Sequence, residues 1–185
     1  MQSIEVSAGI RLTPLDVADA DALFDLTDAN RRHLRIWLPW VDAARCAEDT
    51  RAWIRTSKMQ ASRNEGVQFA VRVDSAIAGV IGHHRIDWPN RCASLGYWLG
   101  EAYQGRGLAT AACRSLVAHA FDVLQLNRVE IRCAVGNRRS CAIPRRLDFR
   151  EEGVLREAQW LYDHFVDHVV YGMLASDWRR ANLGV

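Results

Sequence analysis

The sequence predicts a mixed α/β (α+β) fold in which helices cover both faces of one sheet. Segments that alternate apolar and polar side chains, as β-strands do, are interspersed with segments whose apolar side chains recur at helical spacing. The 185 residues fall within the size range of one domain, and no repeat, low-complexity tract or Ser/Pro-rich linker divides them. We therefore expect residues 1–185 to form a single domain around a mixed sheet.

Each element follows from its local pattern. Asp16 is placed to cap the first helix, and Pro39 interrupts an apolar stretch between the first two helices that could line a groove. Asp74-Ser75 predicts the turn of a hairpin. In chain order, the expected elements are strand 10–14, helix 17–29, helix 47–62, strands 67–73, 76–85 and 92–99, helix 108–124, strand 129–135, helix 138–147, and strands 152–157 and 165–174.

Composition argues against several classes of partner. The 24 Lys and Arg residues are spread along the chain against 22 Asp and Glu residues, so no basic patch predicts nucleic-acid binding. The chain does not start with a basic and apolar leader pattern, and no segment reaches the roughly 20 apolar residues of a membrane span. The five cysteines include no C-x-x-C pair, which argues against a disulfide framework or a zinc site. We expect a soluble, cytoplasmic protein without a metal.

A glycine-rich segment, Gln104-Gly105-Arg106-Gly107-Leu108-Ala109, links a predicted strand to a predicted helix. Glycines let backbone amides approach a phosphate closely, and the start of the helix adds a favourable dipole. The P-loop is excluded because no Gly-Lys-Ser/Thr follows. The dinucleotide fingerprint fails at Thr110, where glycine or alanine is expected. The segment is consistent with a pyrophosphate site, although the glycines alone fit a plain helix-entry turn equally well.

Gln104, Gly107 and Ala109 give the glycine segment the pattern Gln-x-x-Gly-x-Gly/Ala. This pattern resembles the acetyl-CoA loop of the GNAT family of N-acetyltransferases, and several motifs elsewhere in the chain resemble that family too. The resemblance covers nearly the whole chain and is closest in pattern to the ribosomal-protein N-terminal acetyltransferase (RimL/RimJ-like) branch. The matching segments are 37–40, 48–50, 95–99, 104–107, 137–140, 152–156 and 165–171. The resemblance implies the GNAT fold, a mixed and mostly antiparallel central sheet of about seven strands flanked by helices on both faces.

The resemblance also implies which residues bind acetyl-CoA. The backbone of Tyr97, Trp98 and Leu99 would pair with the pantetheine arm as an added strand would. Asn137 and Ser140 would lie beside the pantetheine and the sulfur, although both also suit the start of any helix. Arg106 would add charge-assisted contacts to phosphate. The expected pyrophosphate contacts are Gln104, Gly105, Arg106, Gly107, Leu108, Ala109 and Thr110.

Ser140 is the candidate catalytic residue. The leaving thiolate of coenzyme A resembles a free thiol with a pKa of about 8.5, so a hydroxyl donor within reach lowers the barrier. Many members of the family have a tyrosine four residues later, where this chain has Pro144. Pro144 is also expected to bend or shorten its helix.

No residue stands out as the general base. The strand before the glycine segment contains no carboxylate, and Gln159 occupies a position at which relatives in this branch can have a glutamate. An amide cannot accept the proton. A missing base favours an α-amine, with a pKa of about 8, over a lysine, with a pKa of about 10.4, because more of the α-amine is neutral. The remaining candidates, for which a solvated surface role is the alternative, are Glu101, Glu157, Asp163, Asp167 and His168.

Trp37, Trp40 and Trp160 are candidate walls of an acceptor cleft, with packing in the core as the alternative. We expect an enzyme that transfers the acetyl group of acetyl-CoA directly to a primary amine in a ternary complex. The leading acceptor is the N-terminal α-amine of a protein of the ribosomal type. A small amine, such as an antibiotic, polyamine or amino acid, is the alternative acceptor, and a non-catalytic acyl-CoA sensor is the second alternative. A homodimer is expected by resemblance only.

Overall fold

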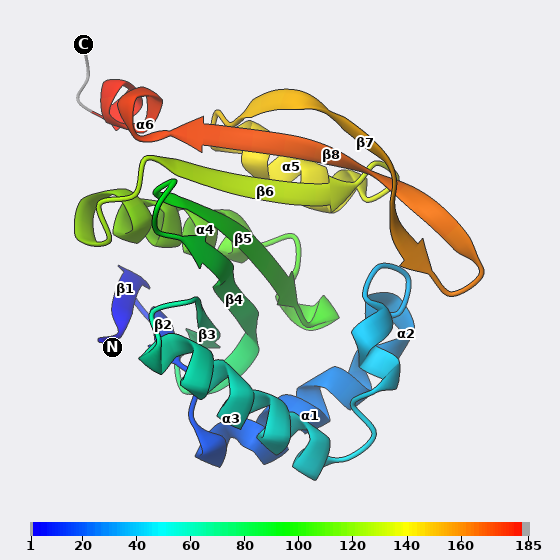
Figure 1. Cartoon of the computed structure of the whole chain (residues 1–185). Helices are drawn as coiled ribbons and strands as arrows, with labels where there is room; N and C mark the ends of the chain where they lie inside the picture. Colours follow the sequence, from blue (N-terminus) through cyan, green and yellow to red (C-terminus); the bar gives the residue numbers. More distant parts are fainter. Residues whose placement is uncertain (1, 183–185) are drawn as a thin grey trace.

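The computed structural model describes residues 2–182 and contains one eight-stranded sheet with the strand order β1-β2-β3-β4-β5-β6-β8-β7 (Figure 1). Neighbouring strands are antiparallel except β5 and β6, which are parallel. The strands are β1 Ile4–Ser7, β2 Ile10–Pro14, β3 Val67–Val73, β4 Ala76–Asp87, β5 Cys92–Leu99, β6 Arg128–Ala134, β7 Arg150–Leu161 and β8 His164–Leu174. The helices are α1 Ala20–Ala29, α2 Arg31–Leu34, α3 Ala47–Ser62, α4 Leu108–Ala118, α5 Arg138–Arg146 and α6 Ala175–Asn182.

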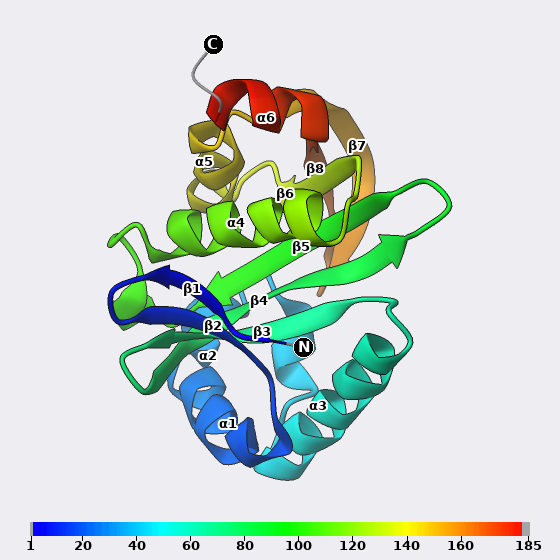
Figure 2. The ribbon, with the colours of Figure 1, turned by 90° about the vertical axis from the view of Figure 1, so that its left-hand side faces the viewer.

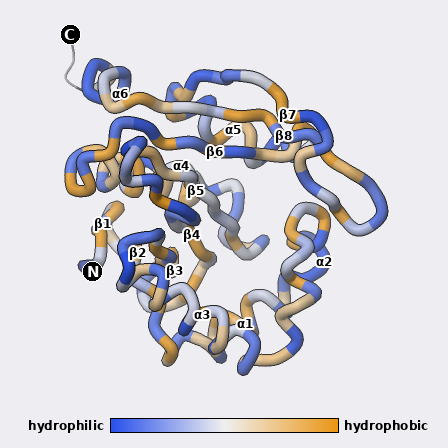
Figure 3. Tube along the Cα trace, in the orientation of Figure 1, coloured by the Kyte–Doolittle hydropathy of each residue, from blue (hydrophilic) through white to orange (hydrophobic). Residues whose placement is uncertain are grey.

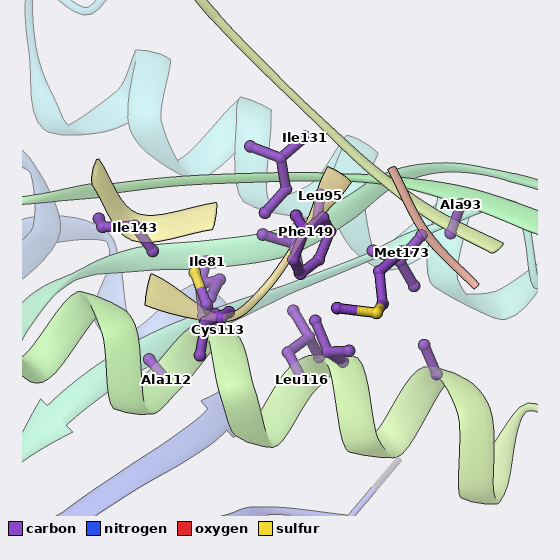
Figure 4. Close-up of a cluster of buried hydrophobic side chains, with 14 of the residues drawn as sticks. Ile81, Ala93, Leu95, Ala112, Cys113, Leu116, Ile131, Ile143, Phe149 and Met173 are labelled. Carbon is purple, nitrogen blue, oxygen red and sulfur yellow. The ribbon is translucent and has the colours of Figure 1, made fainter. Parts of the chain in front are cut away.

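Helices cover both faces of the sheet, as the sequence predicts. Figure 2 shows α1, α2 and α3 on one side and α4, α5 and α6 on the other. The main core lies under α4, where Leu116 and Cys113 pack against strand residues such as Leu95 and Ile131 (Figure 4). A second, smaller cluster joins α1 and α3 to the opposite face through Leu23, Ile54, Ala70 and Val80.

Side-chain alternation fixes the two faces of the central strands. In β6, Val129, Ile131 and Cys133 belong to the main core, so Arg132 and Ala134 point to the face covered by α1 and α3. The hydropathy trace shows this mixture of hydrophobic and hydrophilic positions along the strands (Figure 3). Among the described residues, no helix is long and apolar enough to cross a membrane.

The sequence pattern missed three elements, β1, α2 and α6, and misjudged the end of the helix that becomes α4. Ala175 and Trp178 of α6 are nevertheless buried in the main core. The helix predicted over 108–124 ends at Ala118 and continues as a π-turn, His119–Val123. That turn is closed by a hydrogen bond of 3.0 Å from the Leu124 amide to the His119 carbonyl, a spacing that apolar periodicity does not distinguish from an α-helix.

Candidate active site

The parallel strands β5 and β6 diverge at the centre of the sheet. Their pairing runs from Cys92 opposite Arg128 to Leu95 opposite Ile131, and then stops while β5 continues to Leu99. Within residues 2–182, the β6-facing edge of β5 therefore has no strand partner from Gly96 onward. A cavity of about 1850 Å³ is lined by residues from both sides of this gap. An extended ligand arm could pair with the open strand edge.

The glycine segment forms the turn into α4. Gly105 and Gly107 have φ values of +72° and +75°, and a methyl group at either position would meet no atom within 4 Å. The first helical hydrogen bond runs 3.0 Å from the Ala111 amide to the Gly107 carbonyl. The backbone amides of residues 105–110 donate to no other described residue. Free amides at the start of a helix, beside a cavity, fit a pyrophosphate group.

The residues expected to contact the pyrophosphate differ in their surroundings. Gly105, Gly107, Leu108, Ala109 and Thr110 line the cavity. The Arg106 side chain is exposed, and Arg106 is absent from the cavity lining formed by residues 2–182.

Gln104 also lines the cavity, but its side chain is already bonded within the protein. Its Nε2 donates to the Leu99 carbonyl at 3.2 Å, and its Oε1 accepts from Arg139 Nη1 at 3.1 Å. Gln104, the first residue of the glycine segment, thus ties the end of β5 to the start of α5.

Ser140 sits in the first turn of α5, beside a tyrosine and a cysteine. Asn137 caps the helix, because its Oδ1 accepts from the Ser140 amide at 3.1 Å. Ser140 Oγ lies 3.3 Å from the Tyr97 hydroxyl and 3.1 Å from Cys133 Sγ. The Tyr97 hydroxyl donates to the Ser140 carbonyl at 3.0 Å. Ser140, Asn137 and Tyr97 all line the cavity.

Burial keeps this cluster protonated. It raises the pKa of Tyr97 well above its usual value, and it raises the pKa of Cys133 to about 12. At neutral pH the cluster therefore offers neutral hydrogen-bond donors and no anion, which is the arrangement that a departing thiolate requires. The sequence pattern predicted a role for Ser140 but not its contact with the Tyr97 side chain, because only the backbone of Tyr97 was given a role.

Two of the three candidate acceptor tryptophans line the cavity. Trp40 packs on Trp98 with ring centroids 5.8 Å apart. The Trp37 ring packs against Gly136 in the turn before α5, so closely that a Cβ atom added to this glycine would lie 3.1 Å from the ring. Trp160 packs on Phe165 at 4.8 Å and is exposed, and it is absent from the cavity lining formed by the described residues.

Some of the candidate general bases line the cavity and others lie outside it. Asp163 bonds His164 in an exposed turn, and Asp167 Oδ1 accepts from the Glu157 amide at 2.7 Å. Glu101 and His168 line the cavity, and His168 is bonded to Gln159. Residues 2–182 contain no group of three or more His, Cys, Asp or Glu side chains that could hold a metal ion.

Comparison with known proteins agrees with this geometry. Residues 10–150 match the model of the acetyltransferase (GNAT) domain. YdaF of Bacillus subtilis (strain 168) is 35% identical over 96% of this chain and 98% of its own length. The ribosomal-protein-serine acetyltransferase of Escherichia coli (strain K12) is 30% identical over 94% of this chain and 97% of its own.

A solved structure of RimL, a ribosomal L7/L12 alpha-N-protein acetyltransferase, superposes with a TM-score of 0.92 at 27% identity. The match covers 95% of this chain and 99% of RimL, which was solved with coenzyme A in a disulfide to one of its cysteines. The fold, the unpaired edge of β5, the free amides before α4 and the full-length relatives all agree. The chain belongs to the GNAT family of acetyltransferases, which use acetyl-CoA as the acetyl donor.

Proposed function

We propose that this enzyme acetylates the N-terminal α-amine of a protein of the ribosomal type. The observation that carries the proposal is the cavity, which runs from the free amides before α4 to the wall formed by Trp37 and Trp40. This wall lies beside the gap between β5 and β6, where a chain end could reach the thioester. The names of the E. coli relative and of RimL support the same acceptor class.

The charge of the cavity disfavours a polycationic acceptor. Two carboxylates, Asp49 and Glu101, are among the described lining residues. Asp49 already accepts the amides of Arg45 and Cys46, at 2.9 and 3.1 Å, at the start of α3. A polyamine would require several free carboxylates at the spacing of its amines. A single α-amine makes no such demand.

In this proposal, different residues bind the pyrophosphate, pair with the pantetheine arm and donate a proton to the leaving thiolate. The amides of residues 105–110 bind the pyrophosphate, and the open edge of β5 at Tyr97, Trp98 and Leu99 pairs with the pantetheine arm. Ser140 then faces the thioester sulfur and donates to the thiolate as it leaves.

Turnover and binding test the proposal together. The parent enzyme should acetylate a peptide with a free N-terminus and leave the same peptide with a blocked N-terminus unmodified. Ser140→Ala should bind coenzyme A normally while kcat falls by about 100-fold, because the thiolate loses its donor. Turnover of polyamines or other small amines without any peptide acetylation would refute the acceptor class. Coenzyme A binding without turnover of any amine would favour the non-catalytic sensor.

The proposed setting is cytoplasmic, where ribosomal proteins are made, and the proposed assembly is a homodimer. β7 is an edge strand of the sheet, and the β7–β8 hairpin exposes the apolar side chains of Leu155, Trp160 and Phe165. A second copy could cover these side chains. Light scattering should give twice the chain mass, and a Trp160→Glu variant should shift the mass toward one chain. A parent protein of single-chain mass at micromolar concentration would exclude this assembly.

A further inference from the structure

The acceptor side of the cavity holds a histidine whose two ring nitrogens are in different states. His168 Nε2 lies 2.9 Å from Gln159 Oε1, and both residues line the cavity. An amide oxygen only accepts, so Nε2 carries the hydrogen and donates it to Gln159. In the neutral ring, Nδ1 then has a lone pair, and no described residue contacts it by a hydrogen bond.

The sheet sets His168 on the face where an acceptor would enter. His168 is the register partner of Ala134, whose neighbour Cys133 points into the main core on the opposite face. Directly opposed residues of antiparallel strands lie about 5 Å apart and share a face. Ala134 lines the cavity, and its carbonyl accepts from the Asn137 amide at 2.8 Å, at the start of the turn that leads to Ser140. His168 is thus one strand away from the turn that positions Ser140.

A bulge in β7 brings Gln159 to this histidine. Regular pairing with β8 breaks between Leu155 and Gln159, and Glu157 at the bulge has a φ of +49°. Asp167 stabilises the bulge by accepting the Glu157 amide. Along β7, Gln159 and Leu161 are the positions that are not exposed. Bulges commonly re-aim a side chain beside an active site.

We propose that His168 is the general base of this enzyme and that Gln159 is the positioning residue that fixes its tautomer. The inference rests on the proposed acetyl transfer. The amine nitrogen bonds to the acetyl carbon, the bond from that carbon to sulfur breaks, and the sulfur keeps the electron pair. The proton lost by the nitrogen passes to His168 Nδ1, directly or across one water, and then to solvent. The amide at position 159 orients the ring and takes no proton.

The surroundings keep this ring neutral and able to accept a proton at neutral pH. Burial and the positive charge of Arg132 lower the pKa of His168. Arg132, on β6, is itself bonded to Glu130. Asp167, next to His168 on β8, is engaged by the Glu157 amide, and His164 on the same strand is bonded to Asp163. No carboxylate among the described residues is bonded to His168.

Kinetics of three variants test the proposal. His168→Ala should lower kcat/KM for a peptide by about 100-fold at pH 7.5, and added imidazole should restore part of the rate. Gln159→Ala should lower kcat with little change in the KM for acetyl-CoA. His164→Ala is a matched change four residues away, at an exposed position. It should leave kcat/KM for the peptide and the KM for acetyl-CoA unchanged. Coenzyme A affinity should be the same in all four proteins.

An NMR titration separates a base from a structural role. Long-range ¹H–¹⁵N spectra should show His168 as the Nε2–H tautomer, and Gln159→Glu should raise its pKa, because a carboxylate stabilises the charged ring. His168→Ala with more than half of the parental kcat/KM would overturn the proposal. So would a loss of rate that imidazole does not rescue, or an Nδ1–H tautomer. If the parent acetylates no amine at all, the proposed function fails instead.

Discussion

The hydroxyl of Tyr97 donates to the backbone carbonyl of Ser140 across 3.0 Å. In a regular helix that carbonyl would accept from the amide four residues later, but that position is Pro144, which has no N–H. The proline therefore leaves an acceptor free, and the strand β5 supplies its donor. The same contact brings the tyrosine hydroxyl within 3.3 Å of Ser140 Oγ.

Removing the Tyr97 hydroxyl should slow turnover. Tyr97→Phe leaves the Ser140 carbonyl without this donor and leaves Ser140 Oγ with Cys133 Sγ as its remaining partner. We therefore expect kcat to fall about fivefold to tenfold, the equivalent of one hydrogen bond. The KM for acetyl-CoA should change little, because the backbone of β5 is intact. Steady-state kinetics measure both constants. Tyr97→Phe with the parental kcat would show that this contact only shapes the protein.

Restoring the missing amide should have a related effect. Pro144→Ala gives position 144 an N–H that competes with Tyr97 for the Ser140 carbonyl. We expect a more stable α5 and a lower kcat, measured by thermal unfolding and by steady-state turnover. An increase in stability without any change in kcat would mean that Tyr97 keeps its position beside Ser140 without the carbonyl bond.

The glycine turn should be sensitive to a single methyl group. Gly107→Ala forces an L-residue to a φ of +75°, which costs about 1–2 kcal/mol, and adds a methyl where phosphate would approach. Calorimetry should show coenzyme A affinity reduced about tenfold. Gly9→Ala is the control for backbone strain, since Gly9 has the same φ in the turn between β1 and β2, although its added methyl would also lie 2.9 Å from Asp74 Oδ1. It should lower the melting temperature similarly and leave affinity unchanged; equal affinity losses would argue against the phosphate site.

Acid should destabilise the protein through His83. This side chain is fully buried, both ring nitrogens lack partners among the described residues, and burial lowers its pKa to about 3. Below the unfolded-state pKa of about 6.5, the unfolded chain binds a proton that the folded chain does not. The contribution of His83 to the free energy of unfolding is therefore fully present above pH 6.5. It is lost by about 1.4 kcal/mol per pH unit as the pH drops toward 3.

Urea unfolding between pH 7.5 and pH 5 measures this loss. In His83→Leu, the free energy of unfolding should fall less steeply with decreasing pH, by the slope that corresponds to one bound proton, because leucine has no group to protonate. The exposed His164→Ala variant is the control for loss of a histidine as such. An unchanged slope in His83→Leu would assign the acid sensitivity to other groups, such as His119, whose pKa is also lowered by burial.

Local patterns predicted much of the fold. The bounds of α3, β3 and β5 agree with the prediction because caps, turns and alternation coincide at their ends. Asp148 adopts the left-handed conformation, with a φ of +59°, in the turn between α5 and β7. β7 begins and ends outside its predicted range, since most of its side chains are exposed and give no core-facing pattern.

The sequence predicted site residues only where a single local segment contains the whole motif. The glycine turn and Asn137 at the start of α5 are local features, and both lie along the cavity. Tyr97 meets Ser140 across 43 positions, and His168 meets Gln159 only because β7 bulges. Such contacts depend on strand order and on bulges, which the side-chain periodicity of one segment does not show.

The central claim is that this enzyme acetylates a protein's N-terminal α-amine. The most direct measurement uses a peptide that has both a free N-terminus and an internal lysine, incubated with acetyl-CoA and fragmented in a mass spectrometer. We predict one acetyl group, located on the N-terminal residue, because the α-amine is far more often neutral than the lysine amine at pH 7.5. Acetylation of the lysine alone, or of neither amine, would contradict the claim.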